Sequence, residues 1–163
     1  ANFMFVAAMN PCPCGFYPDL NRCKCTQPQI LRYRGKISGP ILDRMDLCVE
    51  LKAVELKNLQ NNRAEESSAR IRERVENARM RQRKRFEGTM YRFNADIGAA
   101  DLESFCALRT KEKKLMEKLY ESMGLGARGY HRILKVARTI ADLEGEEGIR
   151  EEHLLEAAGY RLV

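Results

Sequence analysis

The stretch "GARGYHRILKVARTIADLEG", residues 126–145, decides the fold class of this chain. Its apolar residues recur every three or four positions, which is the period of an α-helix with one face in a core. Glycines stand on both sides of the periodic segment, where helices commonly begin and end. We therefore expect a helix over 127–144, with a buried stripe of Tyr130, Ile133, Val136, Ala137, Ile140 and Ala141.

Helical patterns continue on both sides of this stretch. We expect four further helices, at residues 67–86, 100–107, 111–123 and 150–160. Gly124 and Gly148 lie in the gaps between them, as is typical of helix ends. The part of the chain after Ser67 is therefore expected to fold by itself as a helical bundle.

The first third of the chain has a different pattern. The apolar run at 3–8 is typical of a strand covered on both faces, and the alternating residues 46–51 predict a second strand. Residues 15–36 lack periodicity and are expected to form a loop, after which residues 38–40 predict a helical start of one or two turns. Two strands cannot form a sheet that stands alone, so we expect the edge of a larger α/β domain.

The predicted fold class is therefore mainly α, with two short strands and a cysteine loop at the C-terminal end of an α/β core. We expect this core at residues 1–52, a polar linker at 53–66 and the helical domain at 67–163. The chain opens on Ala1 rather than on an initiator Met, and we interpret it as a piece of a longer protein.

Composition narrows the class of protein. The chain of 163 residues is 44% hydrophobic and 32% charged, which is ordinary for a globular protein and argues against disorder. No apolar stretch approaches membrane-spanning length and no signal-peptide layout is present, so we expect no membrane partner. The six cysteines do not resemble a secreted disulfide framework, and we therefore expect a cytoplasmic location. The net charge of +6 fits a polyanionic partner such as DNA.

Four of the six cysteines are clustered. Cys12, Cys14, Cys23 and Cys25 form two Cys-x-Cys pairs separated by eight residues. Four thiolates could hold a structural Zn²⁺ tetrahedrally, although Cys-x-x-Cys is the commoner zinc spacing. Free thiols, or one or two disulfides, are the alternatives.

Arginines surround the apolar stripe of the helix expected at 67–86. At helical spacing, Arg70, Arg74, Arg81 and Arg85 fall in one sector, and Arg72, Arg79 and Arg83 flank the other side of the stripe. A solvated face, with arginine stems covering the edge of a core, is favoured over a phosphate-tracking surface for nucleic acid. His131 and His153 have no cysteine or carboxylate partner at ligand spacing, and we expect structural or surface roles for them.

Three motifs together resemble one family. They are "AAMNPCPCG" at 7–15, "ISGPILDRMDL" at 37–47 and the stretch at 126–145, and the closing "EEHLLEAAGYR" at 151–161 also fits. They are similar to the C-terminal part of the magnesium-chelatase-like AAA+ ATPases of the ComM/YifB group, which are bacterial competence-related proteins. The resemblance covers essentially the whole chain and implies an AAA+ core followed by a helical lid.

The resemblance also implies roles for three residues. Asn10 matches the sensor 1 position, where a neutral carboxamide contacts the γ-phosphate and the attacking water. Arg44 matches the arginine finger that enters the ATP site of a neighbouring subunit, and Arg128 matches sensor 2 in the lid. From the residues alone, Asn10 could instead cap a turn, and Arg44 could pair with Asp43 or Asp46.

The resemblance implies a ring-forming, hexameric ATPase that uses ATP with Mg²⁺ and handles DNA during competence and recombination. The chain has no phosphate-binding loop and no Walker B strand, so we expect both upstream of Ala1 and no ATP hydrolysis by the chain alone. The alternatives are a chelatase-type ATPase that acts on a protein or metal-insertion partner, and an ATP-independent helical module that binds nucleic acid.

Overall fold

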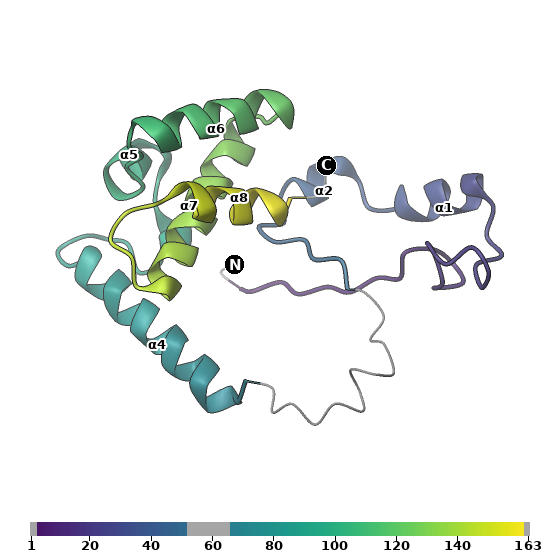
Figure 1. Cartoon of the computed structure of the whole chain (residues 1–163), viewed down its shortest axis with the longest axis horizontal. Coiled ribbons are helices and arrows are strands. Elements are labelled where there is room, and N and C mark those ends of the chain that lie inside the picture. Colours follow the sequence, from purple (N-terminus) through teal and green to yellow (C-terminus); the bar gives the residue numbers. More distant parts are fainter. Residues whose placement is uncertain (1–2, 52–65, 162–163) are drawn as a thin grey trace. The chain divides into compact units, whose positions relative to one another are not determined.

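The computed structural model describes residues 3–51 and 66–161 (Figure 1). Contacts divide the chain into two compact units, Ala1–Arg44 and Met45–Val163. Among the helices of the described residues, none is long and apolar enough to cross a membrane.

The second unit is a bundle of helices built around α7 (Ala127–Glu144). Helix α7 packs against both α4 (Ser68–Arg85) and α8 (Glu151–Gly159), and α8 also contacts α6 (Thr110–Ser122). Two 3₁₀ turns and a short helix join α4 to α6; they are η1 (Asn94–Asp96), η2 (Ala99–Asp101) and α5 (Leu102–Phe105).

The helix expected at 127–144 is confirmed at those bounds. Ile133, Ala137, Ile140 and Ala141 of its stripe are buried, and Tyr130 and Val136 pack against the same core. Each large apolar side chain buried in this way contributes about 1.5–3 kcal/mol to stability. Gly145 caps the C-terminal end of the helix, and its φ of 85° lies in the left-handed region that glycine adopts without a steric penalty.

The other expected helices of this unit are also present. Their ends differ from the expectation by one or two residues, and the segment expected at 100–107 divides into η2 and α5. Ser67 caps the N-terminal end of α4, because its side-chain oxygen accepts a hydrogen bond from the Arg70 N–H at 3.4 Å. Its apolar stripe is buried only in the second half of the helix, because Ile71 and Val75 remain 44% and 45% exposed.

The first unit contains α1 (Gln27–Arg34) and the single turn α2 (Gly39–Leu42). Helix α2 confirms the helical start expected at 38–40. Helix α1 was missed, because the segment lacks apolar periodicity. Its local signal was present: Thr26 precedes it, Pro28 lies in its first turn, and the Gln29 side chain accepts a hydrogen bond from the Thr26 N–H at 2.9 Å.

The two strands expected at 3–8 and 46–51 are wrong, since the described residues contain no strand. Phe3 is 72% exposed and Val6 is 83% exposed, so the apolar run at 3–8 is not covered on either face. A strand exists only through hydrogen bonds to a neighbouring strand, and neither segment has such a neighbour in the described chain. The α/β core expected at 1–52 is therefore not seen, and the expected linker at 53–66 lies outside the described residues apart from Glu66.

Candidate functional site

The cysteine loop brings its four sulfur atoms together. The Sγ atom of Cys12 lies 3.4 Å from that of Cys14 and 3.8 Å from that of Cys23. The four Sγ atoms of Cys12, Cys14, Cys23 and Cys25 all lie within 4.8 Å of one another. Tetrahedral coordination with Zn–S bonds of about 2.3 Å places sulfur atoms about 3.8 Å apart, so this cluster has the size of a four-thiolate zinc site.

Turns on both sides of the loop hold the cysteines in place. Gly15, with a φ of 82°, donates its N–H to the Cys12 carbonyl at 3.1 Å and reverses the chain. Two residues later the Tyr17 N–H donates to the Cys12 sulfur at 3.4 Å. On the other side, the Cys23 N–H donates to the Asp19 carbonyl at 2.7 Å. An N–H donated to a ligand sulfur is the kind of outer contact that orients metal ligands.

The thiols of the cluster differ in how readily they ionise. Burial opposes ionisation of Cys12, but hydrogen bonds from the Tyr17 N–H and from the Cys14 and Cys23 thiols outweigh it and lower its pKa to about 6. At Cys25, a hydrogen bond with the Cys14 backbone lowers the pKa of the thiol. Burial and the sulfurs of Cys14 and Cys12 outweigh that effect and raise the Cys25 pKa to about 12. All six cysteines are free thiols rather than disulfides.

The first unit has almost no hydrophobic core. Among its described residues, Cys12 and Ile30 alone are buried. A segment this small cannot bury enough apolar surface to be stable without a cross-link, a metal or a partner. One of the two buried residues, Cys12, belongs to the cysteine cluster, whereas Cys14 is exposed and Cys23 and Cys25 are half-buried.

The three residues that the family resemblance singled out are all exposed. Asn10 lies in the extended segment before the cysteine loop, with its side chain against Gly15. Arg44 follows α2 and donates from Nη1 to the Pro40 carbonyl at 2.6 Å. Arg128 lies in the first turn of α7, in the second unit. No hydrogen bond or ion pair in the described chain joins any two of them.

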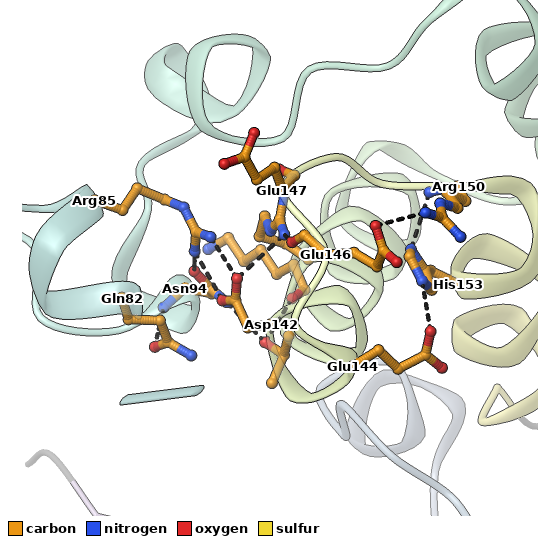
Figure 2. A network of polar contacts seen from close by, with 12 residues as sticks. Gln82, Arg85, Asn94, Asp142, Glu144, Glu146, Glu147, Arg150 and His153 are labelled. Carbon is orange, nitrogen blue, oxygen red and sulfur yellow. Dashed lines mark hydrogen bonds and ion pairs between the residues drawn. The ribbon is translucent and has the colours of Figure 1, made fainter. Parts of the chain in front are cut away.

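A buried polar network ties α4 to α7, and the sequence did not predict it (Figure 2). The Arg85 guanidinium donates to both carboxylate oxygens of Asp142, with Nη1 at 2.7 Å from Oδ2. Asn94 donates from Nδ2 to the same Oδ2 at 2.8 Å, and Arg138 lies 3.1 Å from Oδ1. The Asp142 side chain is fully buried, so its charge is neutralised inside the protein rather than by water.

The arginines of α4 therefore do not act as one group. Arg85 belongs to the core network, and Arg74 pairs with Glu66 at 2.7 Å, as expected for a solvated helix face. Arg79 lies over the Phe93 ring at 4.3 Å. These contacts favour structural roles for the three residues.

His153 also has a structural position. Its Nδ1 accepts a hydrogen bond from the Arg150 N–H at 2.9 Å, so the proton of the neutral ring lies on Nε2, which contacts Glu144 at 3.0 Å (Figure 2). The cluster of Glu144, Glu152 and His153 is therefore a poor metal site, because a metal at Nε2 would force a proton onto Nδ1, against the Arg150 N–H.

Two protein-family models match this chain. The family model for the magnesium chelatase subunit ChlI matches residues 1–59, and the model for the C-terminal part of that subunit matches residues 65–161. The chain belongs to the magnesium-chelatase-like family. The second match coincides with the helical bundle, which is therefore the family's C-terminal domain.

Curated members of the magnesium-chelatase-like family match over the whole chain. The chain is 43% identical to the competence protein ComM of Haemophilus influenzae over 99% of its length, and 40% identical to the uncharacterized protein YifB of Escherichia coli over 100%. An uncharacterized protein of Mycobacterium tuberculosis is 31% identical over 99% of the chain. The chain spans about a third of the length of these relatives, 31% for the first two and 32% for the third, and corresponds to their C-terminal part.

Proposed function

We propose that this chain is the C-terminal section of a ring-forming ATPase that couples ATP hydrolysis to DNA handling in competence and recombination. The observation that carries the proposal is the 43% identity to the competence protein ComM across nearly the whole chain. In this proposal ATP and Mg²⁺ are the cofactors, and the partners are DNA and the neighbouring subunits of a homo-hexamer. The protein acts in the cytoplasm, where thiols stay reduced and available to a metal.

Arg44 is the proposed arginine finger. It lies exposed beyond the turn of α2, and it makes no ion pair with the described part of the chain. Asp46, one alternative partner, contacts Arg132 at 3.3 Å instead. A guanidinium held at a surface turn can enter a neighbouring subunit and stabilise charge on the transferring phosphoryl group. Such fingers raise the rate by about 10³ to 10⁵.

Asn10 and Arg128 are the proposed sensors of bound nucleotide. Asn10 can donate to a phosphate oxygen and accept from water without adding charge. Arg128 lies at the N-terminal end of α7, where its positive charge opposes the helix dipole, and its position therefore carries a small cost in stability. Because Arg128 does not stabilise the helix at this position, the cost supports a role in nucleotide contact rather than in stability.

Zn²⁺ is the third proposed cofactor, held by Cys12, Cys14, Cys23 and Cys25. The spacing of the four sulfur atoms and the near absence of a hydrophobic core in the first unit support this assignment. The role of the metal is structural, because four protein ligands leave no open coordination position.

The test of the function uses the full-length protein. Arg44→Ala should lower kcat by about 10³-fold or more with nucleotide affinity nearly unchanged, because the finger acts on the transition state. Mixing Arg44→Ala subunits with subunits that lack the lysine of the phosphate-binding loop should restore activity, because an intact loop then meets an intact finger. Two controls are needed: the two mutants must be shown to form mixed rings, and each mutant must be active when it is mixed with wild-type subunits. If both controls succeed and the mixture of the two mutants is still inactive, Arg44 is not the finger.

A further inference from the structure

A pocket of about 550 Å³ lies between the cysteine loop and α1. Its volume falls in the range of small-molecule and nucleotide sites, about 300–1,000 Å³. The residues of its lining that matter for binding are Cys14, Cys25, Lys24, Arg32, Tyr33 and Lys36. The wall thus combines two of the clustered cysteines with three cationic side chains and one aromatic ring.

The charge of this pocket is not neutralised from within. Residues 11–42 contain five basic residues and a single acidic one, Asp19. In the described part of the chain, no carboxylate forms an ion pair with Lys24, Arg32 or Lys36. Three cations that converge on one pocket without a local counter-charge repel one another, and a polyanionic ligand would relieve that repulsion.

Other basic residues of the same segment already have contacts. The Arg34 side chain donates from Nε to the Pro11 carbonyl at 3.0 Å and lies over the Tyr17 ring at 5.0 Å. The Arg22 guanidinium lies over the Phe16 ring at 4.1 Å. These two arginines contact residues of the loop, whereas Lys24, Arg32 and Lys36 line the pocket.

The cysteine cluster determines how these cations are arranged. Lys24 lies between two of the cysteines, and Thr26, directly after Cys25, starts α1. Arg32 lies in the last turn of α1 and Lys36 lies two residues beyond the end of that helix, and both residues line the pocket. Tyr33 lies between them in the sequence and adds an aromatic face, with the Lys36 ammonium 5.8 Å from its ring centroid. A metal bound to the cluster would fix Lys24 relative to α1.

We propose that this pocket binds the phosphate backbone of single-stranded nucleic acid, with Lys24, Arg32 and Lys36 as phosphate ligands and Tyr33 as a stacking surface. The combination of a cationic groove with an aromatic ring is the general mode by which proteins bind single strands without sequence preference. This inference rests on the proposed function, because that function supplies DNA as the polyanionic partner. It adds that the DNA binds to the first unit, between the cysteine loop and α1.

The test measures binding of a fluorescent single-stranded oligonucleotide of mixed sequence to this chain, by anisotropy at several salt concentrations. Arg32→Glu with Lys36→Glu should weaken binding by about tenfold or more and make the plot of log affinity against log salt less steep by about 1.4, or 0.7 for each lost phosphate contact. The matched control is Lys114→Glu with Lys118→Glu. This pair of exposed lysines lies on α6 with the same spacing and gives the same change in net charge.

The control pair should bind within about twofold of the wild type if the pocket is the site. An equal loss in both pairs would show that binding follows net charge alone, and it would overturn the inference. Zinc content and the circular dichroism spectrum should be unchanged in both pairs. If the charge reversal perturbs them, Arg32→Gln with Lys36→Gln should still show the loss and the shallower salt dependence.

Competition with free phosphate compounds shows whether the pocket prefers the phosphates of a nucleic-acid strand or those of a free nucleotide. ATP and pyrophosphate should compete with the oligonucleotide only at concentrations far above that of the strand. Competition at equal concentration would assign the pocket to a free nucleotide and reject nucleic acid. The recovery of ATPase activity on mixing Arg44→Ala subunits does not involve this pocket, so failure of the binding test leaves the proposed ATPase intact.

Discussion

Arg85 of α4 and Asp142 of α7 form a bidentate ion pair, although they are 57 positions apart in the sequence. The Asp142 carboxylate is fully buried, and the Arg85 side chain is 19% exposed. Asn94 and Arg138 contact the same carboxylate, so one acidic residue joins α4, η1 and α7.

Asp142→Asn should destabilise the chain strongly. It removes the charge that compensates Arg85 and Arg138, and breaking a buried pair in this way costs about 3–5 kcal/mol. Urea unfolding followed by circular dichroism measures the change in the free energy of unfolding. The control is Glu66→Gln, which removes the exposed partner of Arg74 and should cost less than about 1 kcal/mol. Equal losses in the two variants would mean that the network does not hold α4 against α7.

Gly145→Ala should destabilise the C-terminal end of α7. The φ of 85° at this position is unfavourable for alanine, and the new methyl group would lie 3.2 Å from Nη2 of Arg81. We expect a loss of about 1–2 kcal/mol from the backbone conformation. Gly148→Ala is the matched control, because its methyl group would meet no atom within 4 Å and its φ is not in the left-handed region. Thermal unfolding of both variants checks the difference, and similar melting temperatures would contradict it.

The chain should bind about one Zn²⁺ ion, and Cys12→Ser should abolish that binding, because a four-thiolate site loses its tetrahedral ligand set. Metal analysis of the purified chain measures the stoichiometry, and the thiolate charge-transfer bands of the Co²⁺-substituted chain report the ligand type. Cys48→Ser is the control, since Cys48 lies outside the cluster. Retention of metal by Cys12→Ser, or its loss from Cys48→Ser, would reject the assigned site.

Removal of the metal should affect one unit of the chain only. The first unit has little core of its own, whereas α4 to α8 enclose a large one. Hydrogen exchange after chelation should therefore accelerate at residues 12–36 and stay unchanged in α7. A uniform acceleration through both regions would show that the helical bundle depends on the metal as well.

Arg128→Ala should separate function from stability. In the full-length protein we expect weaker nucleotide binding, since sensor 2 contacts the nucleotide. In the chain itself the free energy of unfolding should stay the same or rise by about 0.3–1 kcal/mol, because the variant removes a positive charge from a helix N-terminus. Nucleotide titration and urea unfolding give the two values. A loss of stability with unchanged nucleotide affinity would make Arg128 a structural residue.

The cysteine loop shows how far local spacing predicts a site. The two Cys-x-Cys pairs suggested a ligand set, and the four sulfur atoms do converge. The turns at Gly15 and Asp19 lie between the cysteines, and α1, which the lack of apolar periodicity did not predict, begins directly after Cys25 and Thr26. The basic pocket depends on that missed helix, since Arg32, Tyr33 and Lys36 converge with Lys24 only once α1 is formed.

The sequence alone predicted the helices of the second unit, because each helical hydrogen bond joins residues four positions apart and the apolar period records which face is buried. The helix at 127–144 was therefore predicted at its observed bounds. Strand bonds join residues from distant segments, so the apolar run at 3–8 could not show whether a neighbour exists. Only the folded structure shows that Arg85, which we predicted to lie on a solvated helix face, turns inward to Asp142. A charge is buried only where a second element brings a partner to it, and that partner lies far away in the sequence.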